Sequence, residues 1–502
     1  MRHLVATCLV SAVAACASVP PPAAPAPAVS ASPQAAPLAE AVARDIHDRA
    51  PAPEGELHYV PPPISEGRLS NGVRVLFIER HKLPLVALGV VSDRGAEQSA
   101  PGVCATMAGL LQRGNEKHRA LEFTAATERV GARWSTECAN GRAYVVASAR
   151  SGQLPALADL LGEMLLTPTF EAAEVAGRRK ATLAALDALS PQSEAERALR
   201  RLLYPAGHPY AEIEGGNRRS VALLRREDLV ASHARVFTPS AVTIVAAGDV
   251  ARDTLLPVLE RTFGAWKGAA PSAKPLAPVT PAEPDGPRIV VIDRPGASQS
   301  TVKVGCLALQ RSDPDFPKLL LTNMILGAET SGRLFVNLRE KHAYTYGVKS
   351  ELESRWHAPG PLEMYGDIQT DHTADAIREI FSELRRIREE PVSDDELRAV
   401  VARRGGDIPS YFATDGDALG SLETIAAHHL PLDEYATLAG RLASTTKADV
   451  TEMANKYLRD AAMRVVVVGD AAKIEPSLVA LNLGPVEVRR AKHEGGPKAE
   501  PR

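Results

Sequence analysis

The sequence MRVVVVGD at residues 463–470 decides the architecture, because it repeats an earlier stretch, AVTIVAAGD at residues 241–249. Both are runs of apolar, largely β-branched residues closed by Gly-Asp, which is typical of a buried strand. A second pair of strand-like runs precedes them, VRVLFIER at 73–80 and RIVVIDR at 288–294. The order of elements therefore starts again halfway along the chain, which indicates two copies of one structural unit.

Each copy mixes strands with helices. In the first copy, further strands are expected at 85–92, 132–136 and 142–149, and helical segments at 102–114, 121–130, 154–189, 194–203 and 221–233. Runs of strands separated by helical runs favour an antiparallel or mixed sheet with helices on one face over a doubly wound parallel sheet. The chain is therefore predicted to be α+β.

Proline and alanine mark the boundaries of the two copies. Residues 268–287 are rich in both and are interpreted as a linker between a domain at 64–267 and a domain at 288–487. Residues 17–63 have a similar composition, which favours an extended, semi-rigid tether. The tail at 488–502 is expected to be disordered.

Composition excludes some classes of function. At 502 residues the chain is too long for one core, and its 45% hydrophobic and 24% charged residues are ordinary for a globular protein. The formal charge of -3 gives no general attraction to nucleic acid, and no basic stripe alternates with aromatic residues. Nucleic acid is therefore not expected as a partner.

The N-terminus has the features of a secretory signal. Arg2 and His3 precede an apolar run at 4–14 that is too short to span a bilayer as a mature helix. Residues 1–16 are therefore interpreted as an export signal.

The signal ends in VAAC at 13–16, which resembles the lipobox of bacterial lipoproteins. The resemblance implies cleavage before Cys16 and its lipidation, and several acyl chains on one residue hold a protein stably at a membrane. Ala17 gives no inner-membrane retention signal, so we expect a periplasmic protein anchored to the outer membrane. The alternative is an ordinary secretory signal with a chance cysteine.

Three cysteines remain after Cys8 leaves with the signal and Cys16 is lipidated, namely Cys104, Cys138 and Cys306. There is no C-x-x-C pair, so neither a zinc knuckle nor a thioredoxin-like site is indicated. A disulfide between Cys104 and Cys138 suits an oxidising compartment, and buried free thiols are the equal alternative.

The stretch GVCATMAGLLQRG at 102–114 predicts a short apolar helix. Ala105, Ala108 and Gly109 share one face of it, which carries almost no side chain. Glycine inside a helix costs about 1 kcal/mol relative to alanine. Taken alone, this bare face is explained by close packing.

Several ordered blocks after the tether resemble the insulinase, or pitrilysin, family of zinc peptidases and its bacterial processing-peptidase-like branch. The matching stretches are LSNGVRV at 69–75, LYP at 203–205 with GHPY at 207–210 and Gly215, TPS at 238–240 leading to Gly248-Asp249, GRLF at 332–335, and LREK at 338–341 leading to Tyr346. The resemblance implies two mitochondrial-processing-peptidase-like domains that form a clamshell, each a mostly antiparallel sheet covered by helices.

Active relatives carry an H-x-x-E-H motif, in which two histidines on one helical face bind zinc and the glutamate acts as general base. In the family's frame these positions fall on Ala105, Ala108 and Gly109. The resemblance places a third ligand, a glutamate, near residues 183–187, where Asp187 is the only carboxylate. We therefore expect no metal cofactor in this chain and no peptide hydrolysis by it alone.

The family's second block is retained. It contains an arginine and a tyrosine, seven positions apart, that reach toward the zinc site and hydrogen-bond the peptide or its developing oxyanion; here they fall on Arg339 and Tyr346. Such donors stabilise a carbonyl oxygen that gains charge. The family's usual Arg-Gly is His342-Ala343 here, and Tyr344 is a second candidate phenol.

A chain without zinc ligands but with this Arg/Tyr pair resembles the non-catalytic subunit of heterodimeric bacterial relatives. The resemblance implies a homologous zinc-bearing partner subunit, zinc in that partner, and a peptide substrate. One alternative is a stand-alone, catalytically inactive peptide-binding or envelope-assembly protein. Another is a self-sufficient hydrolase with unrelated ligands.

Overall fold

The computed structural model describes residues 59–268, 273–281 and 283–490. The expected signal at 1–16, its lipidation site Cys16 and most of the tether lie outside the described residues, as does the end of the tail. Among the residues described, no helix has the length and apolar character needed to cross a bilayer.

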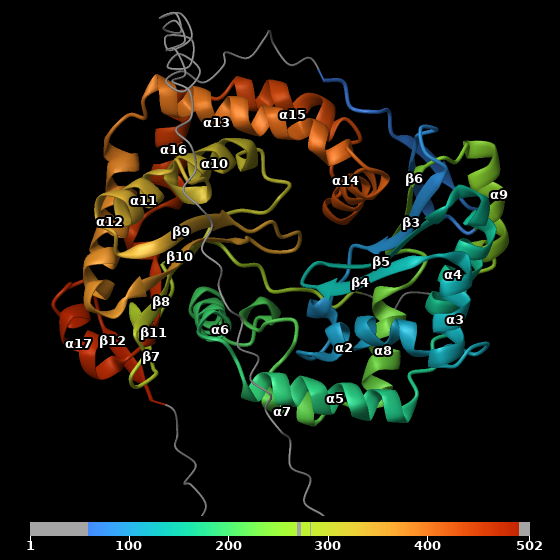
Figure 1. Cartoon of the computed structure of the whole chain (residues 1–502), viewed down its shortest axis with the longest axis horizontal. Coiled ribbons are helices and arrows are strands. Elements are labelled where there is room, and N and C mark those ends of the chain that lie inside the picture. The colour runs from blue at the N-terminus through green and yellow to red at the C-terminus, as the bar shows by residue number, and fades with distance from the viewer. Residues whose placement is uncertain (1–58, 269–272, 282, 491–502) are drawn as a thin grey trace, which may run out of the picture. The chain divides into compact units, whose positions relative to one another are not determined.

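Two six-stranded sheets form the framework (Figure 1). The first contains β1 (Ser65–Arg68), β2 (Arg74–Glu79), β3 (Leu85–Ser92), β4 (Arg133–Ala139), β5 (Arg142–Arg150) and β6 (Val242–Gly248), in the order β1-β2-β6-β3-β5-β4. The second contains β7 (Ile289–Asp293), β8 (Gln299–Leu307), β9 (Thr345–Leu352), β10 (Pro361–Gln369), β11 (Arg464–Gly469) and β12 (Val486–Arg489), in the order β12-β7-β11-β8-β10-β9. Five strands correspond one to one, which confirms the repeat.

Most neighbouring strands are antiparallel. The parallel pairs are β2 with β6, β7 with β11 and β7 with β12. The predicted α+β class with mostly antiparallel sheets is therefore confirmed. The sixth strand of each sheet differs between the copies. In the first sheet it is β1, the first strand in sequence, and in the second sheet it is β12, the last strand in sequence.

Helices account for most of the remaining described chain. The first half contains α2 (Val103–Leu110), α3 (Ala120–Val130), α4 (Leu154–Leu166), α5 (Ala172–Asp187), α6 (Pro191–Leu203), α7 (Arg218–Ala222), α8 (Arg226–Val236) and α9 (Arg252–Phe263). The second half contains α10 (Phe316–Asn323), α11 (Arg333–Phe335), α12 (Thr373–Glu389), α13 (Asp394–Asp407), α14 (Asp415–His428), α15 (Glu434–Ala443), α16 (Lys447–Tyr457) and α17 (Ala471–Val479), with a π-helical turn at Val336–Lys341.

Both faces of each sheet are buried. In the first sheet, Val75, Phe77, Ile244 and Ala246 pack with helices of their own half. The alternate residues Leu76, Ile78, Val245 and Ala247 belong to a different cluster, which includes residues of α14. Burial on both faces explains why the strand sequences are continuously apolar rather than alternating.

The second sheet has the reciprocal arrangement. Val290, Val466 and Val468 pack against α6, which lies in the first half of the chain. Helix α6 contacts β8 and β11, and α14 contacts β3 and β6. Each half therefore covers one face of the other half's sheet with its equivalent helix. This corrects the expectation of helices on one face only.

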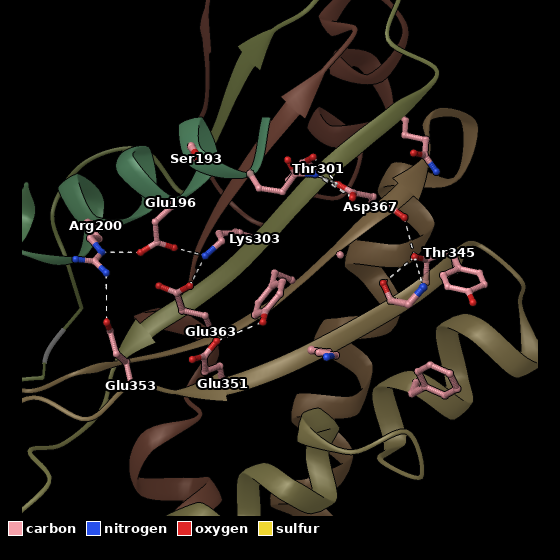
Figure 2. A pocket seen from close by; sticks show the side chains of 18 of the residues that line it. Ser193, Glu196, Arg200, Thr301, Lys303, Thr345, Glu351, Glu353, Glu363 and Asp367 are labelled. Atoms are coloured by element: carbon pink, nitrogen blue, oxygen red, sulfur yellow. Dashed lines mark hydrogen bonds and ion pairs between the residues drawn. The ribbon is translucent and has the colours of Figure 1, made fainter. Parts of the chain in front are cut away.

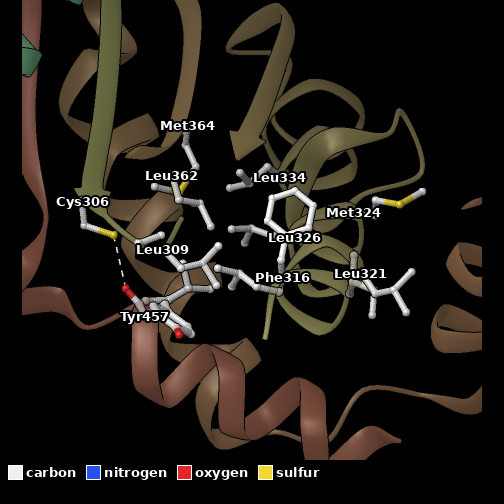
Figure 3. Packing of buried hydrophobic residues seen from close by; sticks show 14 of the residues in the cluster. Cys306, Leu309, Phe316, Leu321, Met324, Leu326, Leu334, Leu362, Met364 and Tyr457 are labelled. Carbon is white, nitrogen blue, oxygen red and sulfur yellow. Dashed lines mark hydrogen bonds between the residues drawn. The ribbon is translucent and has the colours of Figure 1, made fainter. Parts of the chain in front are cut away.

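The remaining face of the second sheet packs against helices of its own half (Figure 3). Leu362 and Met364 of β10 are fully buried there, together with Phe316 of α10. The thiol of Cys306, also fully buried, donates to the carbonyl oxygen of Tyr457 at 3.2 Å. Cys306 is thus a structural thiol without exposure to solvent.

Two strands differ from the sequence-based expectation. Strand β1 lies directly after the expected tether and pairs with β2, although its sequence SEGR has no strand-like apolar pattern. Strand β12 extends to Arg489 and so includes two residues of the expected tail. Both are short outer strands that pair through backbone hydrogen bonds, and apolar periodicity gives no signal for such pairing.

Candidate functional site

Helix α2 (Val103–Leu110) carries Ala105, Ala108 and Gly109, the three positions to which the family resemblance assigns the zinc motif. Ala108 is buried, while Ala105 and Gly109 are half-buried. The helix begins after Gly102, whose φ of 90° is in the left-handed region and suits glycine. A disulfide joins Cys104 of α2 to Cys138 of β4, with their Cα atoms 5.7 Å apart, and so resolves the question left open by the sequence.

The residues around this face do not fit a zinc ion. Alanine and glycine side chains offer no lone pair, and a Cβ atom placed on Gly109 would lie 3.0 Å from Nη2 of Arg178 in α5. A guanidinium therefore lies against the bare face, where zinc binding requires neutral imidazoles and carboxylates. Within the described ranges no group of three or more His, Cys, Asp or Glu residues could hold a metal ion.

Asp187 is the only carboxylate in the window at 183–187, where the family resemblance places the third zinc ligand. Asp187 is at the end of α5 and forms an ion pair with Arg218 at the start of α7. It follows Arg178 by nine residues, which is about 14 Å along a helix. Arg178, which lies against Gly109, is upstream of the expected window at 183–187.

Arg339 and Tyr346 lie side by side. Arg339 is in the π-helical turn and Tyr346 is in β9, and the guanidinium carbon lies 5.0 Å from the ring centroid. The Tyr346 side chain is strongly exposed, with 86% of the residue's surface accessible. Over the part of the chain that the structure describes, the Arg339 guanidinium forms no hydrogen bond or ion pair. Its N–H groups are therefore free to meet a ligand.

Tyr344, the second candidate phenol, has a different environment. Its ring stacks between those of His342 and His372, with centroid separations of 4.9 and 4.6 Å. Desolvation raises the pKa of its hydroxyl. Of these two tyrosines, Tyr346 lines a cavity between α6 and the second sheet, and Tyr344 does not.

This cavity has a volume of about 920 Å³ and lies between α6 and strands β8, β9 and β10 (Figure 2). Its acidic side chains are Glu196, Glu351, Glu353, Glu363 and Asp367, and its basic side chains are Arg200, Lys303 and Lys349. No residue of α2 is among those that line it. The described residues therefore bring Tyr346 to this cavity but do not bring it to the bare face of α2.

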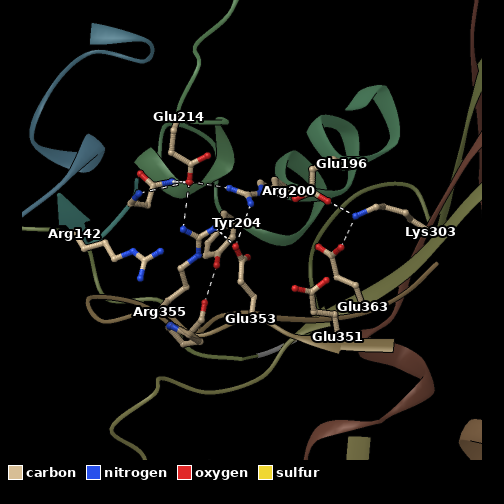
Figure 4. A network of polar contacts seen from close by, with 12 residues as sticks. Arg142, Glu196, Arg200, Tyr204, Glu214, Lys303, Glu351, Glu353, Arg355 and Glu363 are labelled. Atoms are coloured by element: carbon tan, nitrogen blue, oxygen red, sulfur yellow. Dashed lines mark hydrogen bonds and ion pairs between the residues drawn. The ribbon is translucent and has the colours of Figure 1, made fainter. Parts of the chain in front are cut away.

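A chain of charged groups forms one wall of the cavity (Figure 4). Lys303 of β8 is buried and donates to Glu363 of β10 at 2.5 Å and to Glu196 of α6. Glu196 accepts from Arg200 at 2.5 Å, and Arg200 also pairs with Glu353 at 3.3 Å. Helix α6 belongs to the first half of the chain but packs on the sheet of the second half; we call it and its counterpart α14 the exchanged helices. These contacts therefore join the two halves at the cavity.

Burial and charge set the protonation of this wall. Burial and the negative charge of Glu196 raise the pKa of Glu363 to about 7, although Lys303 opposes them. Burial would raise the pKa of Glu196 too, but Lys303 and Arg200 together lower it to about 2. Oε1 of Glu363 has no partner among the described groups. The wall therefore combines a carboxylate whose pKa is lowered by two cations with one whose pKa is raised by burial.

Sequence reasoning did not identify this wall. The available signal was a charged residue inside each of two apolar strand sequences, namely Lys303 in STVKVGC and Glu363 in PLEMY. A buried lysine requires an acidic partner, but the sequence does not show that the partners come from β10 and from a helix of the other half.

Residues 224–403 match the family described as the peptidase M16 inactive domain. An uncharacterised zinc protease of Mycobacterium tuberculosis is 25% identical over 350 residues, covering 67% of this chain and 78% of that protein.

Two solved structures share the fold. A peptidase M16 inactive domain from Pseudomonas fluorescens has a TM-score of 0.75 and 24% identity, covering 81% of this chain and 98% of that one. A protease from Helicobacter pylori has a TM-score of 0.76 and 17% identity, covering 82% of this chain and 100% of that one.

Proposed function

We propose that this chain is a catalytically inactive homologue of the insulinase, or M16, peptidases and serves as the non-catalytic subunit of a zinc peptidase; the match to the M16 inactive domain and the similarity to zinc proteases support this. In this proposal a homologous partner subunit holds the zinc ion and the general base. The present chain supplies contacts to the peptide substrate and to the transition state.

The observation that carries the proposal is the pairing of Arg339 with Tyr346. A guanidinium without an ion pair and an exposed phenol stand together beside a cavity. Both can donate to a peptide carbonyl oxygen, and such donors act most strongly when the oxygen gains charge in a site closed to water.

Purification from native membranes tests the proposal. A tagged chain is expected to co-purify with a zinc-bearing homologue that retains H-x-x-E-H, and the complex to contain zinc and cleave peptides while the isolated chain does neither. Peptide cleavage by the isolated chain, with zinc bound to it, would instead support a self-sufficient hydrolase and contradict the proposal.

Variants of the complex test the two site residues. Arg339→Ala is expected to lower kcat by roughly 10² to 10³, the usual effect of losing one donor to an oxyanion, with the zinc content and subunit ratio unchanged. Arg398→Ala is the matched control, because Arg398 is exposed on α13 and pairs only with neighbouring Asp395. Equal activity of the Arg339→Ala and control complexes would refute the assigned role.

We further propose export and anchoring to the outer membrane through Cys16. The lipobox-like sequence and the disulfide between Cys104 and Cys138 support this proposal, because disulfides persist in oxidising compartments. Cys16→Ser is expected to remove incorporated fatty acid and to release the protein from the membrane fraction. Unchanged membrane association of the variant would point to another mode of attachment.

A stand-alone peptide-binding or envelope-assembly role is the second candidate. It is favoured by the chemistry of the 920 Å³ cavity, whose acidic and basic side chains offer both acceptors and donors to a peptide. Purification without any zinc-bearing homologue, together with peptide binding by the isolated chain, would select this function instead.

A further inference from the structure

A second cavity, of about 1080 Å³, lies on the first half of the chain where β3 begins and α3 ends. It is also lined by residues of β4 and β5 and by residues 413–416, which lead into the exchanged helix α14. It shares no lining residue with the cavity beside Tyr346.

Positive charge dominates this second cavity. Lys82, Arg129, Arg133 and Arg150 line it and are exposed, whereas its acidic lining residues are Glu128 and Asp415, the latter paired with Arg80. The charged groups of these four exposed cations have no hydrogen bond or ion pair to any other described residue. Four like charges around one hollow repel each other, so an anionic surface placed there would be attracted to all of them.

One arginine of the cavity is already satisfied. Arg80 donates to the carbonyl oxygens of Phe412, Ala413 and Thr414 at 2.7 to 3.1 Å and pairs with Asp415 at 3.4 Å. It therefore fixes the start of α14 and leaves the recognition of anions to the other four side chains.

Exposed apolar side chains accompany the charge. Leu83 and Leu85 line the cavity with 60% and 42% of their surface accessible. An exposed leucine alone needs no explanation, but apolar side chains among free cations form the pattern of surfaces that lie at the boundary between lipid head groups and acyl chains.

The first described residue lies next to this surface. The ring of Tyr59, the first described residue, lies 6.4 Å from that of Phe412, whose carbonyl oxygen accepts from Arg80. Val60 beside it is 84% exposed. Tyr59, which Cys16 precedes in the sequence, therefore lies at the edge of the basic cavity.

We propose that this basic surface, formed by Lys82, Arg129, Arg133 and Arg150 with Leu83 and Leu85, docks on anionic phospholipid head groups. The cations face the lipid phosphates, and the leucines reach toward the acyl boundary. Docking orients the folded body on the membrane, and it requires neither lipidation of Cys16 nor the proposed partner subunit.

Vesicle binding by the full mature chain carrying Cys16→Ser tests the proposal without an acyl anchor. The protein is expected to co-sediment with vesicles that contain phosphatidylglycerol and not with pure phosphatidylcholine, and salt should weaken the binding. Arg133→Glu with Arg150→Glu is expected to reduce binding at least tenfold, because each basic residue contributes about fivefold near an anionic surface. Leu83→Ser is expected to weaken binding without changing its salt dependence.

The matched control is Arg398→Glu with Arg403→Glu, which makes the same change in net charge on exposed arginines of α13. Equal losses of vesicle binding in the two double variants would show that binding depends only on net charge, and this would overturn the proposal. Release from the vesicles by inorganic phosphate at constant ionic strength would overturn it in favour of a small-anion site. Binding to polyglutamate but not to vesicles would overturn it in favour of an acidic protein partner.

Discussion

Gly109 has no side chain that could bind zinc, yet the position is closely packed. The family resemblance assigns a zinc-binding histidine to this position, whereas in this chain the guanidinium of Arg178 lies beside the glycine. The approach comes from the end of the long, flexible Arg178 side chain and not from backbone. The position therefore has room for a small side chain once Arg178 shifts by a few tenths of an ångström.

Gly109→Ala is accordingly expected to stabilise the protein by about 0.5 to 1 kcal/mol, the difference in helix propensity between the two residues. Chemical denaturation measures this change. Gly248→Ala is the contrasting variant, because Gly248 has a φ of 129° and a Cβ there would lie 2.3 Å from the carbonyl oxygen of Leu85. It should be clearly destabilised, and a loss of stability in Gly109→Ala would show that Arg178 is held rigidly.

At the scale of elements, the disulfide attaches α2 to the outer strand β4 and closes a loop of 34 residues. Removing it with Cys104→Ala and Cys138→Ala is expected to lower the free energy of unfolding by about 3 to 4 kcal/mol, since the bond restricts the unfolded chain. Urea denaturation with and without a thiol reductant measures the effect. Reductant should destabilise the wild type and leave the double variant unchanged; equal behaviour of the two would mean that the bond does not form.

Helix α14 contains a buried histidine that makes the stability of the folded protein depend on pH. Burial, reinforced by the positive charges of Arg311 and Arg142, lowers the pKa of His428 from 6.5 to about 3. The unfolded chain therefore binds a proton below about pH 6.5 that the folded chain refuses, so stability falls as the pH drops. His428→Leu should remove about 2 kcal/mol of the loss between pH 7 and pH 5, as measured by denaturation at both pH values.

Glu423 on the same helix should act with the opposite sign. Burial and the negative charge of Glu137 raise its pKa from 4.5 to about 7, despite Arg142. The folded chain keeps a proton that the unfolded chain releases, so this group reduces stability as the pH rises from about 4.5 to 7. Glu423→Gln should therefore gain stability relative to the wild type at pH 7 and not at pH 4.5. Parallel pH profiles for the two variants would contradict both assignments.

For the whole molecule, the exchange of α6 and α14 should hold the halves together without a continuous chain. A protease that cuts within residues 273–281, which contain no helix or strand, is expected to leave both fragments in one particle by gel filtration. The fragments should separate only in denaturant. The disulfide does not affect this result, because both of its cysteines lie in the first half. Separation under native conditions would mean that the exchanged helices contribute little binding.

Much of this arrangement was predictable from the sequence. The strand at 85–92 was predicted with the bounds found, and the repeated strand sequences predicted two similar sheets. Helix α6 was expected close to its observed position, but its periodicity shows only that it has an apolar face and not which sheet covers that face. The motif frame predicted Arg339 and Tyr346 as a pair, and the structure places their side chains side by side. The wall formed by Lys303 and Glu363 depends on contacts between distant segments that no local pattern encodes.

The reciprocal helices also bear on how such a chain could arise. A protein with only one copy of the unit would leave one face of its sheet uncovered, because the helix that fits that face would project away from it. In a dimer with a twofold axis, each of two such molecules would cover the open sheet face of the other with this helix. Gene duplication and fusion would then preserve that dimer within a single polypeptide, and the residues 268–287 would be the join between two former subunits.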